Sequence, residues 1–169
     1  MKIENITACV FDAYGTLFDV NSAAAKCKKK LGNRWENFAN AWRTTQLEYT
    51  WLRSLMKKHK NFWEITEDSL DHTMETFKIK KEMRNELLNL YKELSTYSEV
   101  KECLDGLKSK KIKISILSNG TPDLLEGLVK SNNIQNYFDD IMSIETVGVY
   151  KPDPKVYEMP INKYDCKPE

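Results

Sequence analysis

The chain has 169 residues, of which 41% are hydrophobic and 30% charged, and its formal net charge is +1. This length and composition are typical of one globular domain, or of a core with one insertion, and of a chain that buries a real core. Lys and Glu are mixed along the sequence rather than blocked, which argues against a nucleic-acid-binding or membrane-binding surface.

The sequence also indicates where the protein works. No apolar run approaches the roughly 20 residues that a membrane span needs, and we expect no signal peptide at the N-terminus. The cysteines show no Cys-x-x-Cys pairing, so we expect reduced thiols and a cytoplasmic protein. They are Cys9, Cys27, Cys103 and Cys166.

The first predicted element is a short buried strand over Ile6–Phe11, which ends at residues typical of a turn. From Asn21 the pattern becomes helical, and Asn21 and Ser22 are good helix caps. Apolar residues recur at helical spacing from Trp35 to Leu52.

The helical pattern continues without a strand to about Tyr97. The polar run Thr66–Ser69 is expected to open a further helix, and Met83–Leu94 to form the last one of this block. A helical block of this length between one strand and the next is too long for a loop, so it predicts an inserted cap over the catalytic edge.

After this block, strands and helices alternate. The alternation predicts a doubly wound parallel sheet of the Rossmann-like α/β class. We therefore expect an α/β core formed by residues 1–20 and 98–169 and a helical cap formed by residues 21–97. The expected helices are Val100–Lys108, Thr121–Ser131 and Val156–Lys163, and the expected strands are Ile112–Leu117 and Phe138–Ser143.

Three polar motifs follow the three predicted strands, at the edge where an open α/β sheet binds its ligands. Asp12 ends the first strand, Ser118 and Asn119 end the second before a helix N-terminus, and Lys151 lies in a loop after the third. Each motif alone is an ordinary turn or loop, but their order and positions favour one site. A carboxylate beside a lysine stays ionised and can act as a nucleophile.

These motifs resemble those of the haloacid dehalogenase superfamily. The segment from Asp12 to Leu17 looks like its first motif, Ser118-Asn119-Gly120 its second and Lys151-Pro152-Asp153-Pro154 its third. Phe11–Val20 and the run from Trp42 to Leu52 are similar to the L-2-haloacid dehalogenases in particular. Asn61-Phe62-Trp63, followed by Thr66-x-Asp68-x-Leu70, looks like the second cap helix of that branch.

The resemblance implies a reaction that needs neither metal nor cofactor. Asp12 would attack C2 of a short L-2-haloalkanoate and displace halide, and water would then hydrolyse the ester to release a D-2-hydroxyalkanoate. Arg43 would receive the halide with help from Asn119. Ser118 and backbone amides would hold the substrate carboxylate, and Lys151 would neutralise Asp12.

The resemblance assigns supporting roles as well. Thr16 and Tyr157 would orient the nucleophile and Lys151, while Tyr14, Leu47 and Phe62 would line the apolar pocket for the side chain and halogen. The substrate and halide are the expected ligands. The family is often dimeric, and Trp42, Tyr49 and Trp51 could form a homodimer interface. We favour core packing for these aromatic residues.

Two alternatives stay open beside dehalogenation. A magnesium-dependent phosphatase of the same superfamily would carry a second Asp two residues after the nucleophile, where this chain has Tyr14. A phenol, whose ordinary pKa is about 10, replaces that acid poorly. The third reading is a truncated, non-catalytic relative that acts through protein contacts.

The family's fourth motif, a strand followed by an acidic loop, is not found in this sequence. Asp165–Glu169 looks like the approach to such a strand, so we expect that the C-terminal strand is missing and that the sequence is truncated. If the chain ended at Glu169, Asp12 could be alkylated but turnover would be impaired, and the unpaired sheet edge would destabilise the fold.

Overall fold

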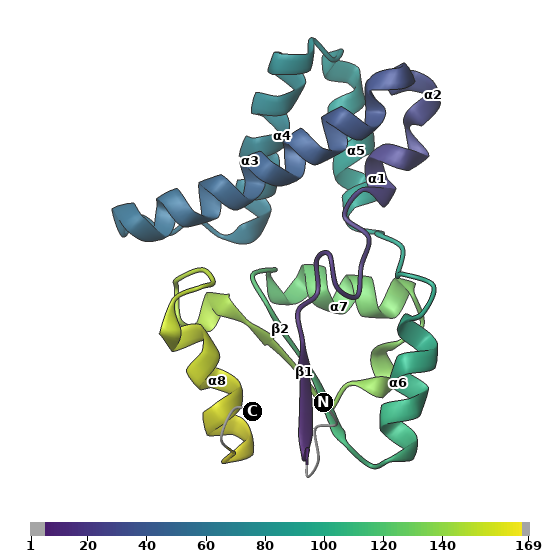
Figure 1. Ribbon diagram of the computed structural model, residues 1–169. Helices are drawn as coiled ribbons and strands as arrows, with labels where there is room; N and C mark the ends of the chain where they lie inside the picture. Colours follow the sequence, from purple (N-terminus) through teal and green to yellow (C-terminus); the bar gives the residue numbers. More distant parts are fainter. Residues whose placement is uncertain (1–5, 167–169) are drawn as a thin grey trace. The chain divides into compact units, whose positions relative to one another are not determined.

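The computed structural model describes residues 6–166, and these divide into two compact units (Figure 1). An α/β unit contains residues 6–18 and 96–166, and a helical unit contains Asp19–Ser95. The sequence placed the corresponding boundaries after residues 20 and 97.

Within residues 6–166, the α/β unit is built on a parallel sheet of three strands in the order β1-β2-β3: β1 (Ala8–Phe11), β2 (Lys113–Ser118) and β3 (Asp140–Ser143). The register aligns Phe11 with Ile116 and Ser118 with Ser143. All three strands therefore end at one edge of the sheet, as the sequence predicted.

Three helices accompany this sheet: α6 (Val100–Ser109), α7 (Pro122–Ser131) and α8 (Pro154–Tyr164) (Figure 1). Tyr164 of α8 is hydrogen-bonded to the hydroxyl of Ser115 in β2. Because side chains alternate along a strand, Ile114 and Ile116 point to the opposite face, and both are fully buried. Right-handed crossovers between β1, β2 and β3 place α6 and α7 together on that face.

The first strand is not buried as the sequence predicted. β1 starts at Ala8 rather than at Ile6, its residues are mostly half-buried, and Val10 is 38% exposed. The physical reason is its position, because β1 lies at the edge of the described sheet whereas β2 lies at its centre. An apolar run alone does not distinguish an edge strand from a central one.

The helical unit is formed by five α-helices among the described residues. They are α1 (Ser22–Lys26), α2 (Lys28–Leu31), α3 (Trp35–Met56), α4 (Phe62–Phe77) and α5 (Arg84–Tyr91), with short 3-10 turns at Gly32–Arg34 and Lys81–Met83. Aromatic rings form much of its core: Phe38 meets Phe77 edge-on at 5.7 Å, and Trp42 lies 5.2 Å from Tyr91 between ring centroids.

Two helix starts differ from the expectation. α4 begins at Phe62 instead of Thr66, because the Asn61 side chain accepts a hydrogen bond from the Glu64 amide and the Glu64 carboxylate accepts one from the Asn61 amide. At α1, Asn21 occupies the N-cap position but its side chain makes no capping bond; the backbone amide of Asn21 donates to Asp19.

Trp51 also differs from the expectation of core packing. Trp42 is buried on α3, but Trp51 is 47% exposed near the end of the same helix. Leu52, Leu55 and Met56 in the last turns of α3 are exposed as well, so the apolar side chains at this end of the helix reach the surface of the unit.

The chain leaves and re-enters the α/β unit at neighbouring points. The amide of Tyr97 donates to the carbonyl of Leu17 at 3.1 Å, and Phe18 forms an antiparallel bridge with Thr96. Within the helical unit, the amide of Asp19 donates to the carbonyl of Ser95 at 2.8 Å. The two segments that connect the units, Leu17–Asp19 and Ser95–Tyr97, are thus hydrogen-bonded to each other.

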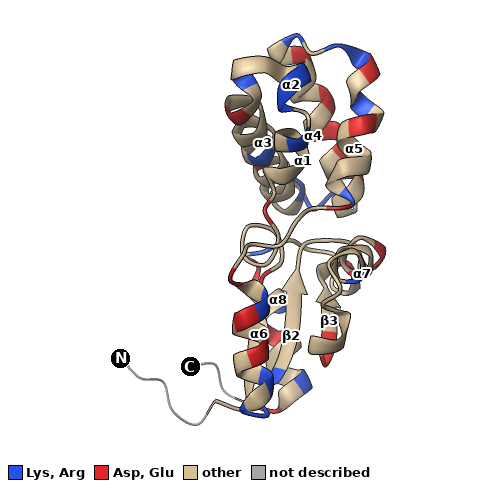
Figure 2. Ribbon diagram, turned by 90° about the vertical axis from the view of Figure 1, so that its right-hand side faces the viewer, with Lys and Arg blue, Asp and Glu red and all other residues tan. Residues whose placement is uncertain are grey.

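Charged residues of both signs are distributed over both units (Figure 2). Several form surface ion pairs, such as Lys30 with Glu86 at 2.6 Å and Lys163 with Asp140 at 3.0 Å. This agrees with the mixed charge pattern of the sequence. No helix in residues 6–166 has the length and apolar character to cross a membrane.

Candidate active site

Asp12 and Lys151 form an ion pair at the carboxyl edge of the sheet. Because Phe11 is in register with Ile116, Asp12 follows β1 at the level of Leu117. The Lys151 ammonium donates to both: to Asp12 Oδ1 at 2.9 Å and to the Leu117 carbonyl at 2.5 Å. The Asp12 side chain is 40% exposed and that of Lys151 19%, so the carboxylate faces solvent while the ammonium is anchored.

The turn after β2 is held by its own side chains. Ser118 is fully buried, and its hydroxyl oxygen accepts a hydrogen bond from the Gly120 amide at 3.1 Å. Ser143, its register partner on β3, donates to the Gly120 carbonyl at 2.6 Å. Asn119 Oδ1 accepts from the Lys151 backbone amide at 3.1 Å, which joins this turn to the Lys151 loop. The second and third motifs are therefore positioned together.

Tyr14 connects the first motif to the second. It is 4% exposed, and an atom added at Gly120 in the position of a Cβ would lie 2.8 Å from Tyr14 Cε2. Such a separation is too short for a real contact, so any side chain at position 120 would force the Tyr14 ring or its surroundings to shift. The tyrosine that stands two residues after Asp12 is thus packed onto the Ser118–Gly120 turn.

Thr16 and Tyr157 are less closely connected to the ion pair. Thr16 is exposed in the turn after Asp12, and its backbone amide donates to the Ala13 carbonyl at 3.3 Å. Tyr157 is 45% exposed on α8. Among the described residues, neither hydroxyl is hydrogen-bonded to Asp12 or Lys151.

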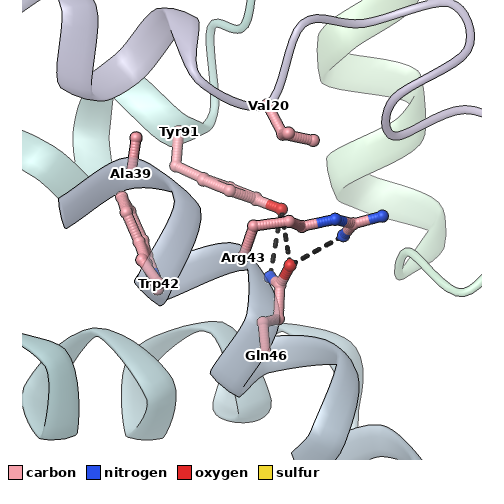
Figure 3. A pocket seen from close by; sticks show the side chains of 6 residues that line it. All are labelled: Val20, Ala39, Trp42, Arg43, Gln46 and Tyr91. Carbon is pink, nitrogen blue, oxygen red and sulfur yellow. Dashed lines mark hydrogen bonds between the residues drawn. The ribbon is translucent and has the colours of Figure 1, made fainter. Parts of the chain in front are cut away.

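Arg43 belongs to a polar cluster inside the helical unit (Figure 3). Its Nη1 donates to Gln46 Oε1 at 2.8 Å, and Gln46 in turn lies 3.0 Å from the Tyr91 hydroxyl through its Nε2. The cluster borders a small cavity of about 10 Å³, close to the minimum that one water molecule needs. The cavity is lined by Val20, Ala39, Trp42, Arg43, Gln46 and Tyr91.

The environment of the cluster changes the pKa of the Tyr91 phenol. Burial raises its pKa above the usual value, and the nearby Arg43 charge and the hydrogen bonds from Gln46 and Arg43 only partly offset that effect. The hydroxyl therefore stays protonated well into the alkaline range and can serve as a neutral hydrogen-bonding group beside the guanidinium.

The two apolar residues expected in the substrate pocket lie at different depths. Leu47 is half-buried on α3, one residue after Gln46, and Phe62 is 1% exposed at the start of α4. Arg43, Leu47 and Phe62 all belong to the helical unit.

The structure brings Asp12, Lys151, Ser118, Asn119 and Tyr14 together in the α/β unit. Sequence reasoning singled out all five, but it assigned no role to Gln46 or Tyr91. Spacing offered a signal for Gln46, because residues three apart on a helix are neighbours and Gln46 follows Arg43 by three. Tyr91 carried no such signal, since its contacts lie 45 residues away in the chain.

Comparison with known proteins places this chain in a family. Residues 6–169 match the family of haloacid dehalogenase-like hydrolases. The chain is 39% identical to the (S)-2-haloacid dehalogenase 1 of Pseudomonas sp. (strain CBS-3), over 98% of this chain and 74% of the relative. It is 40% identical to an (S)-2-haloacid dehalogenase of Pseudomonas sp. (strain YL), over 93% of this chain and 68% of that protein.

A solved structure shows the same fold. The L-2-haloacid dehalogenase from Xanthobacter autotrophicus, determined with chloropropionic acid covalently bound, matches with a TM-score of 0.88 at 35% identity, over 98% of this chain and 67% of that one. The chain therefore belongs to the haloacid dehalogenase-like hydrolases and, within them, to the (S)-2-haloacid dehalogenases.

Proposed function

We propose that the protein hydrolyses short L-2-haloalkanoic acids to D-2-hydroxyalkanoic acids through an ester of Asp12. A carboxylate oxygen of Asp12 forms a bond to C2 as the carbon–halogen bond breaks, and the halide leaves with the bonding electrons. Water then adds to the ester carbonyl carbon of Asp12, which releases the hydroxy acid, restores the carboxylate and yields one proton.

The observation that carries this proposal is the Asp12–Lys151 pair with Tyr14 beside it. The ammonium lies 2.9 Å from one carboxylate oxygen, so the negative charge of Asp12 is stabilised while its other oxygen can attack carbon. Tyr14 is buried against Gly120 and stands where a phosphatase would carry its acid. Halide needs no proton to leave, so this site suits carbon–halogen cleavage.

The remaining residues are assigned by the two anions that the site must hold, the leaving halide and the substrate carboxylate. Arg43, helped by Asn119, receives the halide, because a guanidinium carries a permanent charge and several N–H donors. Ser118 and amides near the N-terminus of α7 hold the substrate carboxylate. Thr16 and Tyr157 orient Asp12 and Lys151, and Tyr14, Leu47 and Phe62 line the apolar pocket. In this proposal the helical unit is the substrate-selecting cap.

The test is release of chloride from L-2-chloropropionate by the full-length protein. Wild type should release chloride, with little from the D-enantiomer, and Asp12→Asn should release none while keeping its circular dichroism spectrum. A single turnover in ¹⁸O-labelled water should place the label in Asp12 rather than in the product, because water adds to the ester carbonyl. Absence of chloride, or label found first in lactate, contradicts the proposal.

We also propose that the protein forms a homodimer through the last turns of α3. Trp51, Leu52, Leu55 and Met56 are exposed there by 47%, 50%, 79% and 52%. Their spacing places them along one side of the helix, and a contiguous apolar patch of this kind is typical of an interface. Its four side chains are apolar, with the exposed Glu48 beside Trp51 and Leu52 at its border, so a second copy of the same apolar surface suits it.

We further propose that the protein works in the cytoplasm. Cys9, Cys27, Cys103 and Cys166 are all free thiols, as is usual in a reducing compartment.

A further inference from the structure

We infer that Gln46 and Tyr91 are positioning residues that hold the Arg43 guanidinium where it receives the halide; this inference rests on the proposed dehalogenation. Gln46 lies in the middle of α3 and is 1% exposed. Burying an amide is unfavourable unless its hydrogen bonds are satisfied. The partners of Gln46 therefore indicate why an amide stands at this position.

Thr66 fixes the orientation of the Gln46 amide. The Thr66 hydroxyl donates to the carbonyl of Phe62 at 2.8 Å, so towards Gln46 it can act only as an acceptor. It accepts from Gln46 Nε2 at 2.7 Å. Because the NH₂ group faces Thr66, the amide oxygen faces the other way and accepts from Arg43 Nη1 at 2.8 Å (Figure 3). A backbone carbonyl of α4 thus sets the direction of the amide oxygen that Arg43 binds.

Tyr91 supports the same arrangement from α5. Its hydroxyl lies 3.0 Å from Gln46 Nε2 and 3.2 Å from Gln46 Oε1, and it also interacts with Arg43. The ring is 3% exposed and packs against Trp42, whose indole N–H donates to the Thr66 carbonyl at 3.2 Å. Side chains of α3, α4 and α5 therefore meet at the Gln46 amide, which binds the guanidinium.

This arrangement matters for a halide because a halide has no directional geometry of its own. A spherical anion accepts N–H donors from any side, so its binding depends on where the guanidinium is held. A long side chain held by a buried amide and a buried phenol loses little rotamer freedom when the anion arrives. As the carbon–halogen bond breaks, the bonding electrons move to the halogen and no proton is transferred, so placement of charge is the whole contribution of Arg43.

The kinetic test compares two leaving groups in the full-length protein. Gln46→Met keeps the length of the side chain and removes both hydrogen-bonding groups, and Tyr91→Phe removes only the hydroxyl. We expect kcat on L-2-chloropropionate to fall about tenfold or more in each variant. The fall on L-2-bromopropionate should be smaller, because bromide leaves with less assistance. KM should change little.

Thr73→Val is the matched control for a purely structural role. Thr73 is as buried as Gln46, at 1% exposed, and its hydroxyl donates to the Ser69 carbonyl on α4, outside the cluster. This variant should leave the bromide-to-chloride ratio of kcat unchanged. The same unchanged ratio in folded Gln46→Met would overturn the inference, because it would make Gln46 a core residue only.

Gln46→Glu gives a pH-dependent signature. The carboxylate would pair with Arg43 and cancel its charge, so activity relative to wild type should be lower than in Gln46→Met and should recover as acidification protonates the glutamate. A relative activity that does not change with pH contradicts the inference.

Binding of bromide separates this inference from the proposed function. The ⁸¹Br resonance of sodium bromide should be broadened by wild type, hardly by Arg43→Met, and distinctly less by Gln46→Met than by wild type. If wild type releases no halide from either substrate, the proposed function fails. Equal broadening by wild type and Gln46→Met overturns the inference whatever the activity is.

Discussion

Gly120 shows how a single missing atom sets the geometry of the site. Gly120→Ala would place a Cβ 2.8 Å from the Tyr14 ring and 3.0 Å from Leu125 Cδ2. Overpacking of this kind costs about 1–3 kcal/mol, so we expect the free energy of unfolding in urea to fall by that amount. Halide release should fall as well, because Tyr14 is displaced from the turn that carries Ser118.

A double-mutant cycle checks the cause of that loss. In a Tyr14→Ala background, which opens space at the same place, Gly120→Ala should cost much less. Gly127→Ala on α7 is the matched control, since nothing lies within 4 Å of its added Cβ and alanine favours a helix. Equal losses for Gly120→Ala in the two backgrounds would show that Tyr14 is not the obstacle.

Residues of the α/β site could be predicted from sequence because parallel strands align their ends. Asp12, Ser118 and Lys151 each follow a predicted strand, and the structure places Lys151 against Asp12. The second partner of Lys151, the Leu117 carbonyl, was not predictable, since a backbone oxygen carries no sequence signal. The Gln46–Tyr91 contact was missed for a similar reason: the packing of α3 against α5 decides it.

At the scale of elements, the start of α4 depends on Asn61. Its side chain accepts from the Glu64 amide at 2.9 Å, and the Glu64 carboxylate accepts from the Asn61 amide at 3.2 Å. Asn61→Ala should therefore lower the free energy of unfolding by about 1 kcal/mol, and Asn61→Ser should largely preserve it. Urea unfolding followed by circular dichroism measures both. A neutral Asn61→Ala variant would show that the capping bonds contribute nothing.

The start of β3 makes stability depend on pH. Asp139 Oδ2 accepts from the Ile114 amide at 2.9 Å and Oδ1 from Lys113 Nζ at 3.0 Å. These two hydrogen bonds lower the pKa of Asp139 below its ordinary value, and the bond from the Ile114 amide is the larger cause. The stabilisation is therefore complete above the unfolded-state pKa of about 3.9 and is lost as the pH falls through the lower, folded-state pKa.

Asp139→Asn provides the measurement. The difference in unfolding free energy between wild type and this variant should be constant near neutral pH and should shrink on acidification below about pH 4. Asp123→Asn, at an exposed position in the first turn of α7, controls for the general effect of removing a carboxylate. A difference between wild type and Asp139→Asn that stays constant down to the lowest pH would contradict this account.

Element types could be predicted from sequence better than element boundaries. The helical period of α3 and the apolar run of β2 are long enough to define both elements. The polar run Thr66–Ser69 predicted the start of α4 about one turn too late, whereas the resemblance placed Asn61-Phe62-Trp63 in the second cap helix, and Asn61 and Glu64 have the spacing of a capping box. The exposure of β1 could not be predicted, because it depends on which strands neighbour it.

The apolar patch at the end of α3 is tested at the scale of the whole molecule. We expect wild type to sediment as a dimer, and Leu55→Glu to sediment as a monomer, because a charge at a position 79% exposed in the single chain would be buried in the interface. Sedimentation velocity over a range of concentrations gives the result.

Thr76→Glu on α4 introduces the same charge at another exposed position and should leave the dimer intact. A wild-type protein that stays monomeric at high concentration, or a dimer that tolerates Leu55→Glu, would show that this patch is not the interface.

The hydrogen-bonded pair of crossings at Leu17–Asp19 and Ser95–Tyr97 makes the helical unit an interchangeable module. Because its two ends already meet, replacing residues 20–94 by a short turn would close a small loop at little entropic cost. The α/β unit then retains its sheet, its ion pair and its Tyr14–Gly120 contact. A different helical unit joined at the same two points would leave the residues around Asp12 unchanged, so this junction lets either unit be replaced without rebuilding the other.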